Sequence, residues 1–281
     1  MRIVIASGKG GTGKTTVASN MALSVWKEVG NVIAVDCDVE EPNMHMILKP
    51  EIDGVQEVQK SLPVVDYDSC DFCGKCAEVC EYNAIAVIGK KVMIFEDLCH
   101  SCGACVLFCP RKAISERGKA IGVIEYGKGI DGIPYIGGRL NVGEAMATPL
   151  ISEVKRFSSS RAEALDEIID APPGTACPVV ETLHGADHVI LVAEPTPFGL
   201  YDLRLTVDVL RVMELDFSVI VNKDGMGFDG VDEFCRKEGL DIILRIPMSM
   251  EFARLYSRGE AIVLHDRKWA KRFAEAYECV K

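Results

Sequence analysis

The sequence lacks both a long hydrophobic run and an excess of basic residues. Its longest purely apolar stretches, such as Val189 to Ala193, fall far short of the ~20 residues that a membrane-spanning helix needs. The 31 Lys and Arg residues against 42 Asp and Glu give a formal net charge of −11, which repels phosphate backbones. The first six residues are too few for the apolar region of a signal peptide. We therefore expect a cytoplasmic protein with no nucleic-acid partner.

Cysteine, in contrast, is abundant and unevenly placed. The chain has 281 residues and 12 cysteines, and eight of these lie between Cys70 and Cys109. A secreted disulfide scaffold would be shorter and would need an export signal, so clustered thiols in a reducing compartment indicate metal ligands. At roughly 150 residues per domain, the length fits one large domain or a medium domain that carries a small one.

Strand and helix patterns alternate along most of the chain. A strand at residues 2–6, a helix at 15–28 and a strand at 32–35 would form a βαβ unit. After Asn141 the same alternation predicts, in order, a helix near 143–155, strands at 164–169 and 188–193, a helix at 200–214, a strand at 217–221, a helix near 231–238, a strand at 241–246 and two closing helices. We therefore expect an α/β fold with a mostly parallel sheet flanked by helices.

Residues 64–113 break this alternation. They are rich in cysteine and contain no long periodic helix, which predicts a small α+β domain inserted into a main domain made of residues 1–63 and 114–281. Within the insert, the pattern of residues 68–80 is repeated in residues 96–109, and each copy continues into a similar tail. We therefore expect two copies of one folding unit, packed side by side.

A glycine-rich phosphate-binding loop follows the first predicted strand and precedes the first helix. The pattern G-x-x-x-x-G-K-[ST] is formed by Gly8, Lys9, Gly10, Gly11, Thr12, Gly13, Lys14 and Thr15, with Thr16 directly after it. Backbone N–H groups of such a loop bind phosphate oxygens, and Lys14 would neutralise the β- and γ-phosphates. The Thr15 hydroxyl would hold Mg²⁺. The alternative is a glycine-rich turn without a ligand.

The second lysine, Lys9, makes this loop resemble the deviant Walker A motif of the MinD, ParA and nitrogenase iron protein superfamily of ATPases. In that superfamily the extra lysine reaches across a nucleotide-sandwich dimer to the phosphates of the partner. The resemblance extends over nearly the whole chain, and it implies a P-loop ATPase that binds ATP and ADP with Mg²⁺ and works as a homodimer.

The resemblance also assigns roles to residues beyond the loop. Asp38 matches the aspartate that positions the attacking water in the magnesium site, and Asp170 matches an outer ligand of Mg²⁺. Gly174 would sense the γ-phosphate through its N–H group. Asn222 would contact the base, and Pro247 would lie in the loop that flanks adenine. Taken alone, either aspartate could equally be a helix cap or a turn former.

The cysteine repeat resembles bacterial two-cluster ferredoxins. C-x₂-C-x₂-C-x₃-C occurs twice, and the second copy ends in Cys109-Pro110. In such proteins the fourth ligand of each cluster comes from the other repeat. One [4Fe–4S] cluster would be held by Cys70, Cys73, Cys76 and Cys109, and the other by Cys99, Cys102, Cys105 and Cys80. Structural zinc is the alternative, although zinc modules usually pair two C-x₂-C knuckles across a longer gap.

Isolated cysteines and a C-terminal aromatic stripe remain. We expect Cys37, Cys235 and Cys279 to be buried, and a redox or metal role for Cys177 stays open. Trp269, Phe273 and Tyr277 recur every four residues, which indicates a helix packed onto the sheet rather than one bound to a membrane.

Together these features predict an ATP-hydrolysing iron–sulfur protein, slow on its own and stimulated by a partner. In the first hypothesis, ATP-driven closure of a homodimer gates electron transfer through the clusters to a redox partner. In the second, the protein is an ATP-dependent carrier or assembly factor for an iron–sulfur or other metallocofactor. Related carriers have a C-x-x-C near the C-terminus, where this chain has only separate cysteines. In a third, the clusters merely brace a positioning ATPase.

Overall fold

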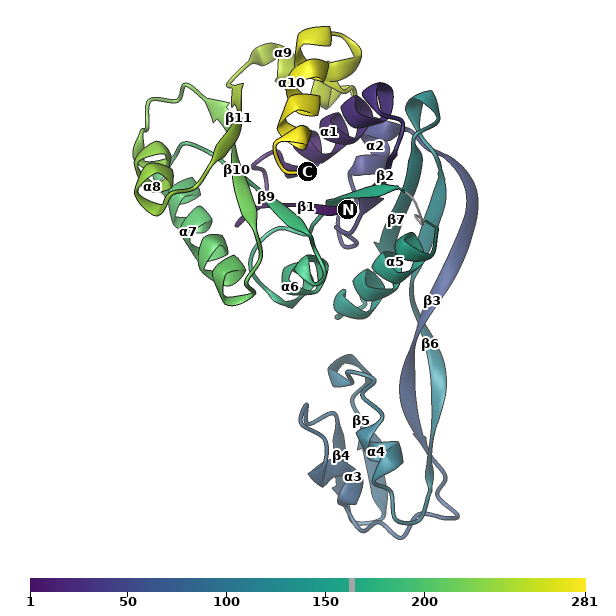
Figure 1. Cartoon of the computed structure of the whole chain (residues 1–281). Coiled ribbons are helices and arrows are strands. Elements are labelled where there is room, and N and C mark those ends of the chain that lie inside the picture. The colour runs from purple at the N-terminus through teal and green to yellow at the C-terminus, as the bar shows by residue number, and fades with distance from the viewer. Residues whose placement is uncertain (162–164) are drawn as a thin grey trace.

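The computed structural model describes residues 1–161 and 165–281, and within them nine strands form one sheet (Figure 1). In spatial order these strands are β11 (Ile242–Pro247), β10 (Phe217–Asp224), β9 (His188–Ala193), β1 (Arg2–Ala6), β8 (Asp166–Asp170), β2 (Val32–Asp36), β7 (Pro134–Leu140), β6 (Ile114–Lys128) and β3 (Glu51–Val65). The first seven run parallel to one another, and β6 and β3 are antiparallel to their neighbours. The expected mostly parallel sheet is therefore confirmed.

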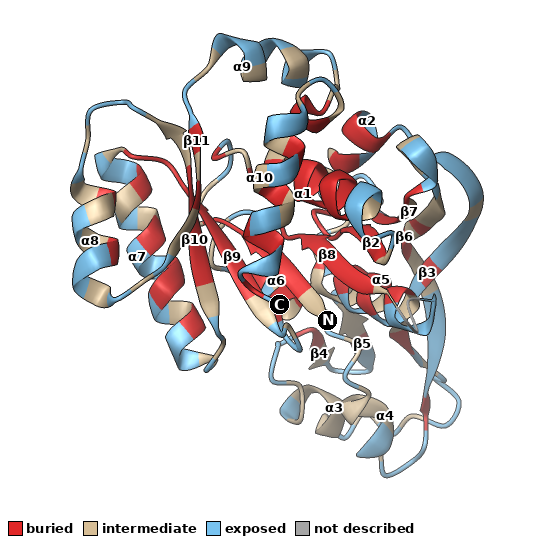
Figure 2. Ribbon diagram, turned by 45° about the horizontal axis from the view of Figure 1, so that its top comes forward, coloured by how far each residue is buried: buried red, intermediate tan, exposed pale blue. Residues whose placement is uncertain are grey.

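Helices cover both faces of this sheet. One face carries α1 (Lys14–Glu28), α2 (Met44–Leu48) and α10 (Arg267–Glu278), and α9 (Met250–Ser257) packs at its margin. The other face carries α5 (Thr148–Arg161), α6 (Cys177–Leu183), α7 (Pro197–Val212) and α8 (Gly230–Glu238). Successive strand residues point to opposite faces, so Ile3 and Ile5 of β1 join one core while Val4 joins the other. The central strands are consequently buried almost throughout (Figure 2).

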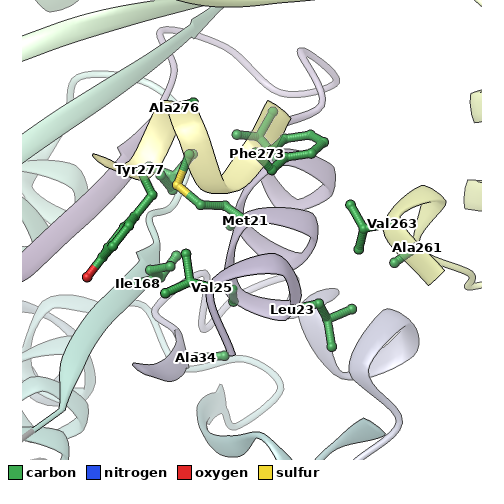
Figure 3. Packing of buried hydrophobic residues seen from close by; sticks show 14 of the residues in the cluster. Met21, Leu23, Val25, Ala34, Ile168, Ala261, Val263, Phe273, Ala276 and Tyr277 are labelled. Carbon is green, nitrogen blue, oxygen red and sulfur yellow. The ribbon is translucent and has the colours of Figure 1, made fainter. Parts of the chain in front are cut away.

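The C-terminal aromatic stripe belongs to the core. Phe273 and Tyr277 of α10 are buried and pack with Met21 and Val25 of α1 (Figure 3). Trp269 is partly buried against the same core. The expectation that this stripe packs onto the sheet is confirmed. None of the helices in the described part of the chain has the length and apolar character needed to cross a membrane.

Several element boundaries differ from the expected ones for local reasons. The helix expected from residue 143 begins at Thr148, because Gly143 has a left-handed φ of 84° and Pro149 suits only a first turn. Helix α7 begins at Pro197, before the expected residue 200, because the Thr196 side chain caps it. Strand β10 continues three residues beyond its expected end. The strand expected at 164–169 begins outside the described residues, and β7, α2 and α6 were not predicted.

A long antiparallel ribbon carries the cysteine-rich segment. Strands β3 and β6 have 15 residues each and pair from Glu51 and Lys128 at one end to Val65 and Ile114 at the other. Beyond Gly122, β6 has no second neighbour, and the ribbon extends away from the sheet (Figure 1). In this part Lys60 and Leu62 of β3 are buried at alternate positions, but Pro63, Val64 and Val65 interrupt the pattern, and residues 115–118 of β6 are all exposed, so the alternation that marks a half-buried strand is short. This is why the ribbon was not predicted.

Residues 66–113 form a small unit at the far end of the ribbon, hereafter the cysteine unit. It contains α3 (Lys75–Glu78), β4 (Ile85–Ile88), β5 (Lys91–Ile94) and α4 (Ala104–Leu107), and β4 and β5 pair as a separate two-stranded sheet. The Asp66 N–H donates to the Ala113 carbonyl at 2.8 Å where the ribbon ends. The chain thus leaves and re-enters the ribbon at adjacent points.

Truncation of Phe273 should destabilise the main domain. We expect Phe273→Ala to lower the free energy of unfolding by about 3–5 kcal/mol, since the ring is fully buried between α10 and α1. Urea unfolding followed by circular dichroism measures this. Phe198→Ala is the matched control, because Phe198 is 79% exposed and its loss should change stability by less than about 0.5 kcal/mol. Equal effects of the two substitutions would contradict this packing.

Candidate functional site

The glycine-rich loop lies where the parallel strands end. It connects β1 to α1, and the carboxyl ends of β2, β8, β9 and β10 surround it. This edge is where parallel α/β sheets bind ligands. Gly13 has a φ of 91°, and a Cβ there would lie 2.2 Å from the Asn222 amide nitrogen. Only glycine therefore fits this position of the loop.

One ammonium group faces three carboxylates beside the loop. Lys14 Nζ lies 3.2 Å from Asp170 Oδ1 and 3.6 Å from Asp38 Oδ2. Asp36 is fully buried beside them, and its oxygens accept the N–H groups of Asp38 at 3.1 Å and of Met44 at 3.0 Å. Three carboxyl groups thus surround one ammonium group, and negative charge is in excess at this place.

This excess shows in the pKa values. Burial, with the charge of Asp170 second, raises the pKa of Asp36 well above its ordinary range. Burial also raises the pKa of Asp38 to about 6, although Lys14 opposes the shift. Burial raises the pKa of Asp170 as well, again against the effect of Lys14. For Lys14, burial lowers the pKa, but the carboxylates outweigh it and the net shift is upward. A cation added here would relieve the repulsion between the carboxylates.

The residues of this site fit Mg²⁺. Asp170 Oδ2 is buried and has no hydrogen-bond partner among residues 1–161 and 165–281. A buried carboxylate oxygen left unpaired costs free energy, and oxygen is the ligand that Mg²⁺ prefers. The Thr15 side chain lies beside Asp170 and favours its charged form. Thr15, Asp38 and Asp170 would therefore hold the ion between them, directly or through water.

Lys9 is held by a residue that sequence reasoning missed. Its Nζ lies 3.2 Å from Glu194 Oε2, and Lys223 pairs with the other oxygen of the same carboxylate. Lys223 Nζ also donates to the Gly11 carbonyl at 2.9 Å. The only signal for Glu194 was its position as a carboxylate directly after the apolar strand β9. In this structure both lysines therefore contact Glu194 of their own chain.

The three residues expected around the base and the γ-phosphate lie at the same edge of the sheet. The Asn222 amide donates to the Thr12 carbonyl at 2.7 Å, and its oxygen accepts the Lys223 N–H at 2.9 Å. The Gly174 N–H donates to the Ser7 carbonyl at 3.0 Å, and Gly174 has a φ of 97°. Pro247 is exposed at the end of β11. Asn222 and Gly174 thus hold the loop in place here.

The cysteine unit brings together the two sets of thiols expected from the repeat. One cavity of about 340 Å³, including its opening to solvent, is lined by Cys70, Cys73, Cys76 and Cys109. A second, of about 390 Å³, is lined by Cys80, Cys99, Cys102 and Cys105. Each cavity therefore has three thiols from one repeat and the fourth from the other. Among the described residues, no three His, Cys, Asp or Glu side chains are grouped to hold a single metal ion.

Backbone hydrogen bonds to sulfur support the thiols contributed across the repeats. The Ala84 N–H donates to Cys80 Sγ and the Ala113 N–H donates to Cys109 Sγ, both at 3.3 Å. Such donors stabilise a thiolate that ligates iron. The donor set therefore fits two four-iron clusters. We refer to these as the outer cavity (Cys70, Cys73, Cys76, Cys109) and the inner cavity (Cys80, Cys99, Cys102, Cys105), by their order along the ribbon.

The other cysteines lie apart from these cavities. Cys37 and Cys235 are buried, as expected. The expectation was wrong for Cys279, which is exposed because it follows the last turn of α10. Cys177 is exposed at the first position of α6.

Comparison with known proteins gives one family across the chain. The model of the CobQ/CobB/MinD/ParA nucleotide binding domain matches residues 3–262. An uncharacterized protein of Methanocaldococcus jannaschii is 31% identical, over 100% of this chain and 96% of its own. A protein of Pyrococcus abyssi named iron-sulfur cluster carrier protein is 25% identical, over 99% of this chain and 84% of its own.

Solved structures share the fold. The cell division ATPase MinD of Pyrococcus furiosus has a TM-score of 0.60 at 19% identity, over 99% of this chain and 96% of its own. The septum site-determining protein MinD of Pyrococcus horikoshii, complexed with Mg-ADP, has a TM-score of 0.61 at 19% identity, over 100% of this chain and 96% of its own. The expected P-loop NTPase fold is therefore confirmed.

The raised pKa of Asp38 predicts that the ligand-free protein loses stability as the pH rises. Between about pH 4 and pH 6 the folded chain keeps a proton on this carboxyl that the unfolded chain has released, so folding is favoured at the acid end of this window. Asp38→Asn removes the effect. In EDTA and without nucleotide, we expect this variant to be more stable than wild type at pH 7.5, by on the order of 2–3 kcal/mol, and by only about 1 kcal/mol at pH 4.5.

Urea unfolding at the two pH values measures this difference. Asp208→Asn, at an exposed position of α7, is the control and should change stability equally little at both. An Asp38→Asn variant that is no more stable than wild type at pH 7.5 would show that the ionised Asp38 carboxylate does not destabilise the folded protein.

Proposed function

The chain belongs to the CobQ/CobB/MinD/ParA nucleotide-binding domain family, and we propose that it is an ATPase that couples closure of a homodimer to electron transfer through two [4Fe–4S] clusters. One observation carries the proposal. The ribbon that bears the two thiol-lined cavities is built from strands of the same sheet that ends at Lys14 and its carboxylates. A nucleotide site and two iron–sulfur sites thus share one folded chain.

In the nucleotide half, the chain's own residues bind the phosphates and orient water. Lys14 and the backbone N–H groups of the loop bind the β- and γ-phosphates. Thr15 and Asp38, with Asp170 behind them, would hold Mg²⁺, which would neutralise phosphate charge. Asp38 orients the attacking water in line with the bond to the γ-phosphate and accepts a hydrogen bond from it. The buried position of Asp38 and its contact with Lys14 support this role.

Closure of the dimer involves Lys9. In the free chain its ammonium group is paired with Glu194, which is itself shared with Lys223. When a second copy brings its nucleotide to this edge, Lys9 exchanges the carboxylate for the partner's phosphates. Lys223 stays with Glu194, so this carboxylate does not lose both its cations when Lys9 leaves.

In the cysteine unit, eight thiolates would hold the clusters, four around each cavity. Each cluster, when bound, carries one electron at a time. The Ala84 and Ala113 N–H groups stabilise the thiolates of Cys80 and Cys109. A redox protein or a cofactor-assembly protein is the expected partner.

Two routes connect the nucleotide site with the ribbon. On one side, Asp36 accepts the Met44 N–H, and Met44 opens α2, which leads directly into β3. On the other side, the Val39 carbonyl, one residue after Asp38, accepts the Leu140 N–H at the end of β7. A change around Asp38 on nucleotide binding would therefore reach the ribbon through β3, which is one of its strands, and through β7, which pairs with β6.

A buried ion pair ties the second route to the ribbon. Glu144, in the loop after β7, lies 2.5 Å from Lys60 of β3 and 3.4 Å from Lys119 of β6. The side chains of Lys60 and Glu144 are almost completely buried. Lys119 also lies 3.6 Å from Glu96, three residues before Cys99. The pairs form a continuous path from the nucleotide edge of the sheet to the inner cavity.

A carrier function is the second candidate. The Pyrococcus abyssi and Pyrococcus horikoshii proteins named iron-sulfur cluster carriers match 99% of this chain, which favours it. Against it stands the separation of the remaining thiols, since Cys177 is exposed at the start of α6 and Cys279 is exposed directly after α10. The two functions make different predictions for the iron: an electron-transfer protein keeps it during turnover, and a carrier passes it to an acceptor.

Anaerobic turnover separates the two. We expect a brown protein with about eight iron atoms per chain, since each cubane holds four. With MgATP, reduced protein should pass electrons to an acceptor faster than without it, while the iron content per chain stays constant. Lys14→Ala should abolish the acceleration, and Lys237→Ala, at an exposed position of α8, should leave it. Iron lost to an apo-acceptor would support the carrier; a colourless zinc protein would overturn both.

The ion pair at Glu144 should be needed for ATP to accelerate electron transfer, but not for binding of nucleotide or of the clusters. We expect Glu144→Gln to keep its iron and its affinity for nucleotide and to lose the acceleration by ATP, because Lys60 is left buried without its partner. Unfolding should become easier by about 3–5 kcal/mol. A double variant, Lys60→Met with Glu144→Leu, separates the effects, since apolar replacement restores stability without the charges.

The control for this prediction is Glu125→Gln. Glu125 of β6 pairs with Arg139 of the neighbouring strand β7 near the surface, and its loss should change neither stability nor coupling. Acceleration by ATP that persists in both Glu144 variants would show that the nucleotide acts on the ribbon by another route.

A further inference from the structure

The two halves of the cysteine unit have the same backbone. Matched positions share left-handed φ values, namely 59° and 55° at Phe72 and Ser101, 79° and 72° at Gly74 and Gly103, and 52° at both Asn83 and Lys112. The two N–H to Sγ hydrogen bonds have the same length, and α3 and α4 occupy matched places. Differences between the two cavities therefore come from side chains.

The clearest difference lies between the first and second cysteines of each repeat. Phe72 lines the outer cavity, and its counterpart Ser101 lines the inner one. Ser101 Oγ is buried and has no hydrogen-bond partner among the described residues. A buried hydroxyl without a partner costs free energy, so an acceptor inside the cavity would satisfy it. Phe72 can offer no such donor at the matched position.

A second pair of matched positions also differs. In the outer cavity, Asp71 pairs with Arg111 at 3.7 Å. In the inner cavity the same two places hold His100 and Tyr82, whose rings stack with centroids 3.6 Å apart and planes 10° apart. Side chains thus distinguish the two cavities three times: by a free hydroxyl in the inner lining, by an aromatic pair in place of an ion pair, and by Ala104 where the outer cavity has Lys75, whose charge is paired with Glu78 at 2.7 Å on the surface.

We propose that the Ser101 hydroxyl donates a hydrogen bond to the iron–sulfur group of the inner cavity and gives it the higher reduction potential of the two. The inference rests on the proposed function. Reduction adds one electron and so one negative charge, and a hydrogen-bond donor to sulfur stabilises the charged form. Glu116 also lines this cavity, but it is exposed, and water and salt screen its charge.

This assignment sets the direction of electron transfer between the two clusters. Ser61 of the ribbon lines the inner cavity, whereas Val65, farther from the sheet, lines the outer one. The inner site is thus the one nearer the nucleotide domain along β3, and the Lys119–Glu96 ion pair reaches the residues just before its Cys99. An electron that enters at the outer site then settles at the inner site, on the side of the ATPase.

Potentiometric titration of the holoprotein tests the assignment. The anaerobic protein is titrated with dithionite and followed by electron paramagnetic resonance and visible absorption, which resolve two one-electron couples. We expect Ser101→Ala to lower the higher potential alone, by about fivefold to tenfold in the reduction equilibrium, or roughly 40–60 mV at 59 mV per tenfold. Phe72→Ser should raise the lower potential alone, because it adds the hydroxyl to the other cavity.

Ser69→Ala is the matched control. Ser69 precedes the first cysteine of its repeat, but its hydroxyl donates to Asp66 at 2.7 Å on the exposed surface, so both potentials should stay in place. Unmoved potentials in Ser101→Ala at full iron content, or equal shifts of both couples, would overturn the assignment. A wild-type protein without iron would instead overturn the proposed function itself, and iron analysis of each sample distinguishes the two results.

Discussion

The excess of carboxylate over ammonium charge at the end of the parallel strands governs the nucleotide site. Lys14 alone faces Asp36, Asp38 and Asp170, and all four groups are buried. Such a group is complete only with a cation beside it, and a magnesium-bound polyphosphate supplies that cation together with anions for the loop. The glycines of the loop and the contacts of Asn222 and Gly174 hold the backbone ready for those anions. The free chain is therefore organised around a ligand that it does not itself contain.

The ribbon holds the cysteine unit away from the main sheet. The cysteine unit has few apolar residues to bury, since its cavities are lined by thiols, and it cannot join either core of the main sheet. Strands β3 and β6 hold it away from the sheet by backbone hydrogen bonds, which do not depend on side-chain burial. Some ribbon side chains are buried as well, among them Val58, Leu62, Ile121 and Ile124, and so is the ion pair of Lys60 and Glu144. It fixes the ribbon to the loop after β7, where charge complementarity replaces apolar packing.

The elements found from sequence were those whose signals are local. Six strands of the main sheet, namely β1, β2, β8, β9, β10 and β11, and helices α1 and α8 have apolar patterns of their own, so their existence and order followed from the residues. The ribbon, β7 and α6 were missed, because the alternation in the ribbon is short and interrupted, β7 contains a pair of glycines, and α6 is a seven-residue helix with a proline in its first turn. The early start expected for α5 shows the same limit, since the left-handed Gly143 interrupts a segment whose composition still favours a helix.

At the two sites, the sequence by itself determined which groups exist and how they are spaced over a few residues. A glycine-rich loop with its lysine, and thiols three residues apart, are short-range patterns that hardly depend on the rest of the fold. Only the tertiary structure decided which partners meet. It joined Lys9 to Glu194, Asn222 to the Thr12 carbonyl, and Lys60 to Glu144. These contacts join residues brought together by strand order and by the return of the chain along the ribbon, which no local pattern encodes.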